Sequence, residues 1–435
     1  MKKDQRIRDP VHNLIAFSEK HDDDKLLWDL LDTPAVQRLR RIKQLGFSEF
    51  VYPGATHTRF SHVLGAMQMA RRMLAVFERN QVFDGSDHAQ RRRDTLAAAL
   101  LHDIGHGPYS HVFEEISASL GLKKDHEKYT DELIKETEVS KILKDYGCFD
   151  GVLKFFSEEP GSDPYSAIIS SQMDCDRLDF LVRDRYHTGL RSATIDLEWL
   201  FDSLRIEKVS VDLKSDAAMY AFVVLPKGVT VAEEFVLSYL KMYQNVYFHK
   251  ATRAIQFMAK DIVSDAVKLH ADAAALKDHP LVRFYVKKSE SLDEYIRLDD
   301  ASVVSLIQLV AEGSFGETSA LAKRYLRRDI YKGIDLPTTP DGNVAQQHAA
   351  SFKAALQAEG IRHQIDIVPQ KTYKQYDVMD ESFVKNILVA QGGEYVALAS
   401  ISESVRLLPK KRARIYFNDD DSRERALKLL KSTKP

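Results

Sequence analysis

The stretch that decides the fold is Leu101-His102-Asp103-Ile104-Gly105-His106-Gly107-Pro108-Tyr109-Ser110-His111. It follows a tight apolar run, Ala97 to Leu101, which predicts the end of a buried helix. Imidazole and carboxylate groups lose hydration at such a place, and this costs free energy unless they find a polar partner. Hydrophobic burial therefore does not explain why these residues are there. The stretch therefore predicts a functional site at a helix end.

Other polar residues point to the same site. Seven of the fifteen histidines lie between residues 57 and 126: His57, His62, His88, His102, His106, His111 and His126. One such histidine alone is usually a capped or partly buried imidazole, and one His-Asp pair is weak evidence. The pair gains weight from His62, in an apolar helical pattern, and from Asp176, in Met173-Asp174-Cys175-Asp176-Arg177-Leu178-Asp179. At a helix end, these side chains can turn toward one cation.

Composition limits the class of protein. With 435 residues, 44% of them hydrophobic and 29% charged, the chain can bury the core of one large domain or of two to three packed units. The formal charge of −2 argues against a protein that coats nucleic acid or an anionic membrane. Two cysteines cannot supply a disulfide framework, and no apolar run approaches a membrane span or a secretory signal. We expect a cytoplasmic protein without a membrane or nucleic-acid partner.

The periodicity predicts a mainly α fold with a small C-terminal α+β unit. Helical patterns cover 35–45, 58–79, 174–186 and 229–269, and two strand-like runs, 207–213 and 219–225, predict a hairpin. A Pro/Gly/Asp-rich link at 333–343 separates a unit of residues 1–332 from a unit of residues 333–435. In the second unit we expect strands at 364–368, 386–390, 395–400 and 414–417, a helix at 349–359 and a basic helix from residue 422.

Several motifs carry a family resemblance that covers about residues 5 to 190. Besides 101–111 they are Asp9-Pro10-Val11-His12, Asp32-Thr33-Pro34-Ala35-Val36-Gln37-Arg38-Leu39-Arg40, Ile42-Lys43-Gln44-Leu45-Gly46 and Tyr52-Pro53-Gly54-Ala55-Thr56-His57-Thr58-Arg59-Phe60-Ser61-His62. Together they resemble the deoxynucleoside triphosphate (dNTP) triphosphohydrolases, which are HD-domain metal-dependent phosphohydrolases. The resemblance implies a helical HD fold and identifies the metal ligands as His62, His102, Asp103 and Asp176.

The resemblance also implies the reaction. Hydroxide attacks the α-phosphorus of a dNTP and breaks its bond to the 5′ oxygen of the nucleoside, which releases intact triphosphate. His111 protonates the departing 5′ oxygen as general acid, and Glu114 orients His111. A site of two imidazoles and two carboxylates suits Mn, Fe, Ni or Zn, and Mg²⁺ is a further candidate. Motif matches assign Arg59, His106, His126 and Arg177 to the polyphosphate, with His126 as the next candidate for the acid. Gln44 and Asp184 match residues that hold the sugar 3′-hydroxyl, and Leu45 matches the apolar wall at the 2′ carbon.

The chain departs from the family pattern in two places. Phe180 stands where a phosphate-contacting Tyr is expected, and the phosphate Arg and sugar-contacting Tyr do not align cleanly near residues 243–255, where Arg253 could compensate.

The resemblance implies a guanine-nucleotide effector site at Asp32, Gln37 and Arg40, and a homodimer or homotetramer. The alternative for these three residues is a solvated or dimer-facing basic helix face. Two functions compete with dNTP hydrolysis. One is another HD phosphohydrolase activity, on a nucleoside monophosphate, a cyclic nucleotide or a nucleic-acid end. The other is a non-enzymatic nucleotide-binding regulator.

Overall fold

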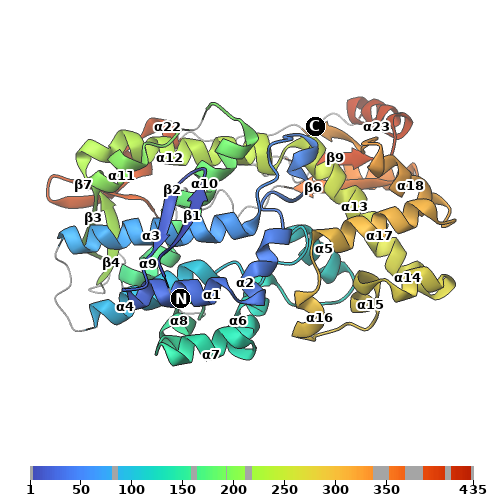
Figure 1. Cartoon of the computed structure of the whole chain (residues 1–435). Helices are drawn as coiled ribbons and strands as arrows, with labels where there is room; N and C mark the ends of the chain where they lie inside the picture. The colour runs from blue at the N-terminus through green and yellow to red at the C-terminus, as the bar shows by residue number, and fades with distance from the viewer. Residues whose placement is uncertain are drawn as a thin grey trace.

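Helices make up most of the molecule, as the sequence predicts (Figure 1). The computed structural model describes residues 3–80, 87–157, 164–192, 194–210, 218–336, 352–367, 386–406 and 413–432. The helices up to residue 203 are α1 (Asp22–Leu31), α2 (Pro34–Arg38), α3 (Arg59–Asn80), α4 (His88–Leu101), α5 (His111–Ser119), α6 (His126–Glu136), α7 (Glu138–Asp145), α8 (Phe149–Phe155), α9 (Pro164–Ile169), α10 (Cys175–Thr188) and α11 (Leu197–Ser203). The later ones are α12 (Val229–Met242), α13 (Lys250–Lys268), α14 (Ala274–Asp278), α15 (Pro280–Val286), α16 (Leu292–Ile296), α17 (Asp300–Glu312), α18 (Glu317–Leu326), α21 (Leu398–Ile401), α22 (Glu403–Arg406) and α23 (Asp420–Ser432).

The described strands form three small sheets. An N-terminal antiparallel ribbon joins β1 (Gln5–Asp9) to β2 (Asn13–Phe17). The second sheet has the order β3-β4-β7-β8, from β3 (Leu204–Ser210), β4 (Ala218–Val224), β7 (Leu388–Gln391) and β8 (Glu394–Ala397). The third has the order β5-β9-β6, from β5 (Lys332–Asp335), β9 (Ala413–Phe417) and β6 (His363–Ile367). The predicted hairpin is therefore present as β3 and β4.

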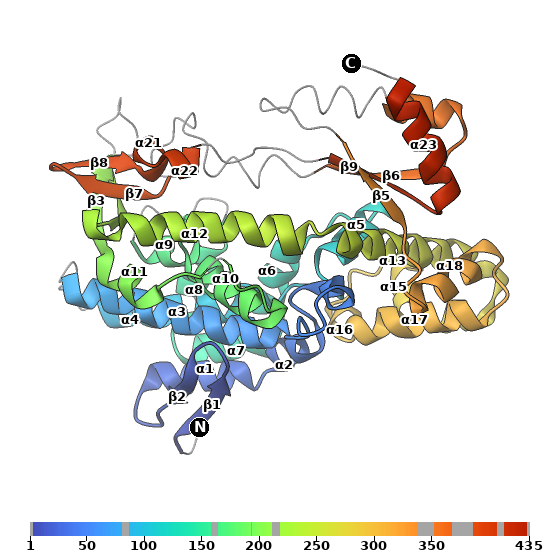
Figure 2. The same cartoon turned by 90° about the horizontal axis from the view of Figure 1, so that it is seen from above.

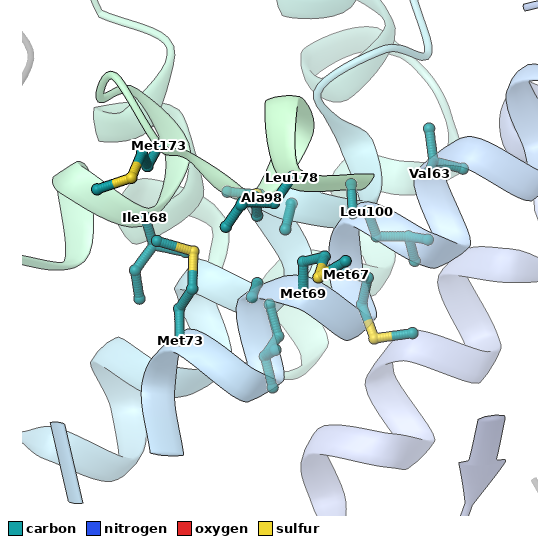
Figure 3. Packing of buried hydrophobic residues seen from close by; sticks show 14 of the residues in the cluster. Val63, Met67, Met69, Met73, Ala98, Leu100, Ile168, Met173 and Leu178 are labelled. Atoms are coloured by element: carbon teal, nitrogen blue, oxygen red, sulfur yellow. The ribbon is translucent and has the colours of Figure 1, made fainter. Parts of the chain in front are cut away.

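The core that positions the site lies where α3 and α4 meet α9 and α10 (Figure 3). Val63, Met67 and Met73 of α3 are buried against Leu100 of α4 and Leu178 of α10. Close packing of α3 on α10 requires Gly65, because a Cβ there would lie 1.9 Å from Asp179 Oδ1. A second core joins α5 to α13, α15, α17 and α18. The end of α4 and the start of α5 are thus held between two cores.

Two predicted helices are interrupted by tertiary contacts. The helix expected over 35–45 begins at Thr33, whose hydroxyl accepts a hydrogen bond from Val36 N–H, but α2 ends at Arg38 and a 3-10 turn, η1 (Leu39–Arg41), follows. Beyond it, the N–H groups of Lys43 and Gln44 bond to the Asp300 carboxylate and to the His57 carbonyl. The helix expected over 229–269 is split by a π turn, η4 (Tyr243–Tyr247), and His249 caps the new start of α13.

The elements after residue 333 lie at both ends of the molecule (Figure 2). β7 pairs in parallel with β4, whereas β5, β6 and β9 form their own sheet at the other end. The strand expected over 395–400 is short, since β8 ends at Ala397 and α21 follows. Most of the link at 333–343, residue 368, the start of the helix at 349–359 and residues 433–435 lie outside the described residues. A domain boundary near 333 stays a prediction. Among the described helices, none has the length and apolar character needed to cross a bilayer.

Candidate metal centre and active site

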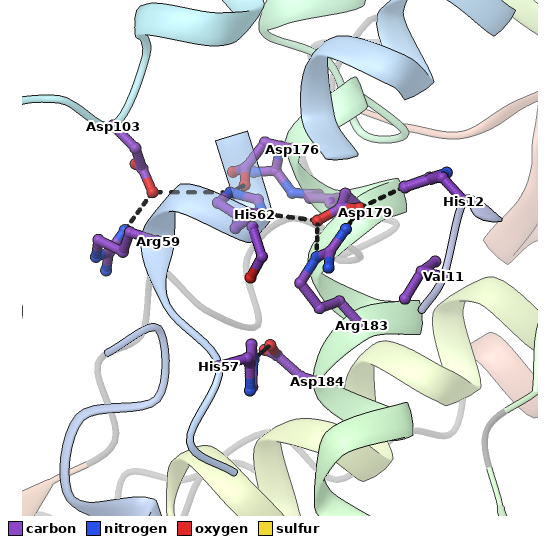
Figure 4. Close-up of polar contacts among 12 residues, drawn as sticks. Val11, His12, His57, Arg59, His62, Asp103, Asp176, Asp179, Arg183 and Asp184 are labelled. Carbon is purple, nitrogen blue, oxygen red and sulfur yellow. Dashed lines mark hydrogen bonds and ion pairs between the residues drawn. The ribbon is translucent and has the colours of Figure 1, made fainter. Parts of the chain in front are cut away.

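Four side chains, from α3, from the turn after α4 and from α10, converge on one point, and Figure 4 shows three of them, His62, Asp103 and Asp176. His62 Nε2 lies 3.3 Å from His102 Nε2, 3.0 Å from Asp176 Oδ1 and 3.7 Å from Asp103 Oδ2. His102 Nε2 lies 3.5 Å from Asp103 Oδ1 and 3.6 Å from Asp176 Oδ1. The structure therefore brings together the four residues predicted as metal ligands.

Local structure explains how each ligand reaches this point. His62 is fully buried in the first turn of α3, and His102 follows the last residue of α4. Asp176 is in the first turn of α10, just after Asp174, whose side chain caps that helix by accepting a hydrogen bond from Arg177 N–H. Placement at helix ends frees these side chains from one shared helical face, so adjacent residues such as His102 and Asp103 can both turn inward.

A buried layer behind His62 fixes its ring. His62 Nδ1 lies 2.9 Å from Asp179 Oδ2, and the other oxygen of Asp179 lies 2.7 Å from His12 Nε2. Arg183 donates to both Asp179 oxygens, at 2.8 and 3.0 Å, and also to Asp9. A carboxylate that accepts from one imidazole nitrogen leaves the other nitrogen available as a metal ligand. The N-terminal ribbon thus contributes Asp9 and His12 to the support of the site.

The donor set fits a divalent transition metal. Metal–ligand bonds of about 2.0–2.2 Å would place neighbouring ligand atoms about 3.0–3.4 Å apart, close to the separations seen here. Burial alone would lower the pKa of His62, but hydrogen bonds to Asp176 and Asp179 outweigh it and raise that pKa to about 10. Burial alone would raise the pKa of Asp176, but hydrogen bonds to His102 and His62 outweigh it and hold that pKa well below its usual range. The cluster is therefore strongly polarised to hold positive charge.

A second group adjoins the first and contains the predicted acid. Glu114 Oε2 lies 3.2 Å from His111 Nδ1, and Glu114 Oε1 lies 2.5 Å from His126 Nδ1. Burial opposes ionisation of Glu114, but these histidines outweigh it and hold the pKa of the carboxyl far below its usual range. His106 joins the two groups, because its ring stacks on His126 at 4.0 Å and its Nε2 lies 3.3 Å from Asp103 Oδ1. His106, Glu114 and His126 are also close enough to hold a cation themselves.

Arg59 places a positive charge beside the metal cluster. Its guanidinium pairs with Asp103 and donates to Ser110 Oγ at 2.8 Å. Arg59 is 5% exposed, so its charge acts on the cluster with little screening by water.

Asp184, one of the residues predicted to hold the sugar, has a carboxylate that two neighbouring side chains hold in place. Asp184 Oδ1 is 2.8 Å from His57 Nε2, and Tyr247 donates to Asp184 Oδ2 at 2.7 Å. The Gln44 amide oxygen is buried and accepts no hydrogen bond from any described residue, and Leu45 is partly buried against the first core. Tyr247 thus supplies a tyrosine next to Asp184, in the segment where the sequence pattern gives no clean match.

Other predicted residues have partners away from the metal cluster. Arg177 pairs with Asp174 and donates to the Ser171 carbonyl at 2.8 Å. Arg253 makes a two-pronged pair with Asp366, with both bonds at 3.0 Å. Its proposed compensation for the missing phosphate Arg therefore finds no support in this arrangement, because the guanidinium binds the C-terminal sheet.

The predicted effector residues lie just before α2 (Asp32), on α2 (Gln37) and in the following turn η1 (Arg40). Asp32 and Arg40 are exposed, and Gln37 donates to the Leu31 carbonyl at 2.7 Å. Arg40 donates to Gln37 Oε1 at 2.8 Å, so these two side chains share one face as their spacing predicts. Arg38, expected on a basic solvated face, is instead 1% exposed and lies over the Tyr295 ring.

Sequence reasoning missed the support layer of His12, Asp179 and Arg183, and also Tyr247. A signal existed for part of that layer, because Asp179 and Arg183 follow Asp176 at three and seven residues on one helix and His12 ends a quoted motif. For Tyr247 there was no such signal, since a π turn sets its direction.

Comparisons with known proteins agree with the geometry. A family model for the HD domain matches residues 59–179, and a model for an HD associated region matches residues 214–416. The chain is 31% identical to the Bacillus subtilis protein YwfO over 424 residues, which cover 95% of this chain and 92% of that protein. It is 26% identical to a Dictyostelium discoideum homologue of a deoxynucleoside triphosphate triphosphohydrolase, covering 76% of this chain and 60% of that protein.

The fold has a solved counterpart as well. The structure of a phosphohydrolase from Bacteroides thetaiotaomicron superimposes with a TM-score of 0.73 at 25% identity, covering 96% of this chain and all of that chain. The ligand cluster, both family models and these relatives point to one conclusion. The chain belongs to the HD-domain family of phosphohydrolases.

Proposed function

We propose that this phosphohydrolase cleaves dNTPs to a deoxynucleoside and inorganic triphosphate. One observation carries the proposal. The candidate acid His111, held by Glu114, lies next to the metal cluster through the His106 ring, so a phosphoryl group at the cluster would meet a proton donor at its leaving oxygen. The likeness to named dNTP triphosphohydrolases over three quarters of the chain supports this substrate class.

Different residues of the chain would bind the metal, bind the polyphosphate and donate the proton. A divalent metal held by His62, His102, Asp103 and Asp176 would lower the pKa of a bound water and neutralise phosphoryl oxygens. Arg59, His106 and His126 offer the cationic and donor groups for the polyphosphate. Arg177 could join them by turning away from Asp174. His111 gives its proton to the departing 5′ oxygen, and its 71% exposed side chain can reach a bound ligand.

Sugar recognition falls to Asp184, Gln44 and Leu45. The Gln44 amide oxygen, which accepts no hydrogen bond from the part of the chain that the structure describes, is a buried acceptor suited to a sugar hydroxyl. A polar group left unpaired there costs about 1–3 kcal/mol. We propose in addition that Asp32, Gln37 and Arg40 bind a guanine-nucleotide effector and that the enzyme works as a homodimer or homotetramer in the cytoplasm. Mn²⁺, Fe²⁺, Ni²⁺ or Zn²⁺, with Mg²⁺ on the substrate, are the cations to test.

Incubation of the purified protein with each dNTP and NTP plus Mn²⁺, followed by product identification, tests the reaction. We expect triphosphate and deoxynucleoside without diphosphate or monophosphate intermediates. Asp176→Ala and His102→Ala should lose bound transition metal and activity while remaining folded, as measured by elemental analysis and circular dichroism. Stepwise release of phosphate, or activity on monophosphates alone, would assign the protein to a different HD phosphohydrolase activity.

A further inference from the structure

A short segment far along the chain contacts both halves of the site. Residues 295–300, here called the brace, run from the end of α16 to the start of α17. The brace touches two segments of the site: the loop 104–111, which leads from the metal ligands to His111, and the segment 38–43, which leads from α2 to Gln44. These contacts are made by buried groups and by the backbone, so they do not depend on surface side chains.

On the loop side, the brace bonds directly to the backbone at two residues and reaches a third through Arg38. Tyr295 donates its hydroxyl to the Gly105 carbonyl at 2.6 Å, and Asp300 Oδ1 accepts a hydrogen bond from Tyr109 N–H at 2.7 Å. Arg38 reaches the Ile104 carbonyl at 3.4 Å while donating to the Leu298 carbonyl of the brace at 3.0 Å. Tyr295, Asp300 and Arg38 are 1%, 6% and 1% exposed.

On the substrate side, the same Asp300 holds the residue before Gln44. Asp300 Oδ2 accepts a hydrogen bond from Lys43 N–H at 2.9 Å. The two oxygens of one buried carboxylate therefore tie Lys43 to Tyr109, which are distant in sequence. Asp299, its neighbour, instead caps α17 and pairs with the exposed Arg41 at 2.6 Å.

The backbone at Tyr109 and Ser110 has an unfavourable conformation that such hydrogen bonds must stabilise. Tyr109 and Ser110 both have positive φ, 53° and 56°, a region that costs a residue with a side chain of order 1–2 kcal/mol each. His111 follows directly as the first residue of α5, so the direction of its ring depends on this turn. The stacked rings of Tyr109 and Phe47, 3.9 Å apart, and the bond from Arg59 to Ser110 complete the support.

We propose that Asp300 is a positioning residue, which aims His111 and Gln44 at the same ligand by fixing the backbone of Tyr109 and Lys43. The catalytic part of this inference rests on the proposed function, because His111 must act as the acid. The backbone part does not. Tyr295 has the same role for Gly105 and the metal ligands before it.

Asp300→Asn tests the inference, with Asp299→Asn as the matched control. Asparagine keeps one accepting oxygen, so one of the two N–H groups loses its partner, whereas at residue 299 it can still cap the helix. We expect faster amide exchange in peptides covering 40–47 and 104–113 for Asp300→Asn and not for Asp299→Asn. Turnover should fall up to about 100-fold with KM changed less, as for a catalytic group displaced by about 1 Å.

A double mutant separates positioning from general damage. If Asp300 acts through His111, Asp300→Asn should lower turnover far less in a His111→Ala background than in the wild type. Equal losses in both backgrounds, or unchanged exchange in both peptides, would overturn the proposal. Tyr295→Phe gives a second variant that keeps the ring and should raise exchange in 104–113 only. If no dNTP is hydrolysed by the wild type, the proposed function fails, and the exchange comparison still decides the role of the brace.

Discussion

At the scale of single residues, the histidines of the site differ mainly in exposure. His62 and His106 are buried and held by carboxylates, whereas the side chain of His111 is 71% exposed and contacts Glu114 and the edges of the His106 and His126 rings. A group that gives a proton to a ligand must reach it, and one that fixes a metal must not move. The site separates these demands by exposure, since both histidines lie in the first turn of a helix but His62 is fully buried and His111 is open to the ligand.

His111→Ala should lower turnover far more than it weakens substrate binding. General acid catalysis contributes about 10²–10⁴-fold, so a loss in that range is expected at saturating dNTP. Glu114→Gln should give a smaller loss, because it misorients the imidazole without removing it. Steady-state kinetics distinguish this from a phosphate contact, whose loss would raise KM with turnover preserved. A wild-type rate in His111→Ala would make His126 the next candidate.

Asp300 should make stability depend on pH in an unusual direction for an aspartate. Burial is the main cause that raises the pKa of Asp300 to about 6, from 3.8. Between pH 4 and 6, the unfolded chain loses this proton and the folded chain keeps it, so folding weakens by about 3 kcal/mol as the pH rises. The Asp300→Asn variant should not show this loss of stability, because asparagine has no proton to release in this pH range. Urea unfolding gives the free energy of unfolding of both proteins at pH 4 and pH 7, and the variant should become more stable relative to the wild type at the higher pH. The same difference between the two proteins at both pH values would contradict the raised pKa.

At the scale of elements, α2 and the turn η1 that follows it contribute to two surfaces. Arg38 points inward to the brace and to Ile104, while Gln37 and Arg40 face outward and bond to each other. One face therefore belongs to the core and the other is open to a ligand. An effector bound outside would lie one side chain away from contacts that reach the loop 104–111.

Gln37→Ala and Arg40→Ala should abolish activation by a guanine nucleotide while leaving the metal content unchanged. Couplings between sites are commonly about 1–3 kcal/mol, so the wild-type rate on a second dNTP should rise between about 5-fold and 150-fold when dGTP or GTP is added. Arg41→Ala is the control, because Arg41 pairs with Asp299 instead. If added dGTP or GTP leaves the wild-type rate unchanged, the face formed by Gln37 and Arg40 has a structural role only.

At the scale of the whole molecule, the C-terminal strands anchor to the helical body at two places. β7 extends the β3–β4 hairpin, and Asp366 of β6 holds Arg253 of α13. The Asp366 side chain is 5% exposed and that of Arg253 is 16% exposed, so this ion pair is largely shielded from water.

Asp366→Ala should destabilise the protein by about 2 kcal/mol, since the largely buried Arg253 guanidinium loses both charged hydrogen bonds and keeps Gln256 and a 3.6 Å contact with Glu115. Glu317→Ala breaks the pair with Arg362, whose side chains are 89% and 78% exposed, and should change stability by less than about 1 kcal/mol. Chemical unfolding measures both. Equal small effects would show that the third sheet is not held to α13 through Arg253.

The sequence determined the parts of this protein that local chemistry controls. Periodicity placed α3, α10 and the hairpin, and an apolar run placed the end of α4. Residue type, together with the family resemblance, predicted that His62, His102, Asp103 and Asp176 would meet. Those predictions succeed because side chains at helix ends have few directions available, and a buried imidazole or carboxylate must find a polar partner.

Only the tertiary structure decided the rest. The end of α2 at Arg38, the inward turn of Arg38 and the Asp300 bridge depend on acceptors that arrive from residues 295–300, more than 180 positions beyond the loop they hold. The same holds for Tyr247, directed by a π turn, and for β7 beside β4. Local propensity cannot show such choices, because the free energy that makes them comes from hydrogen bonds between segments that meet only in the folded chain.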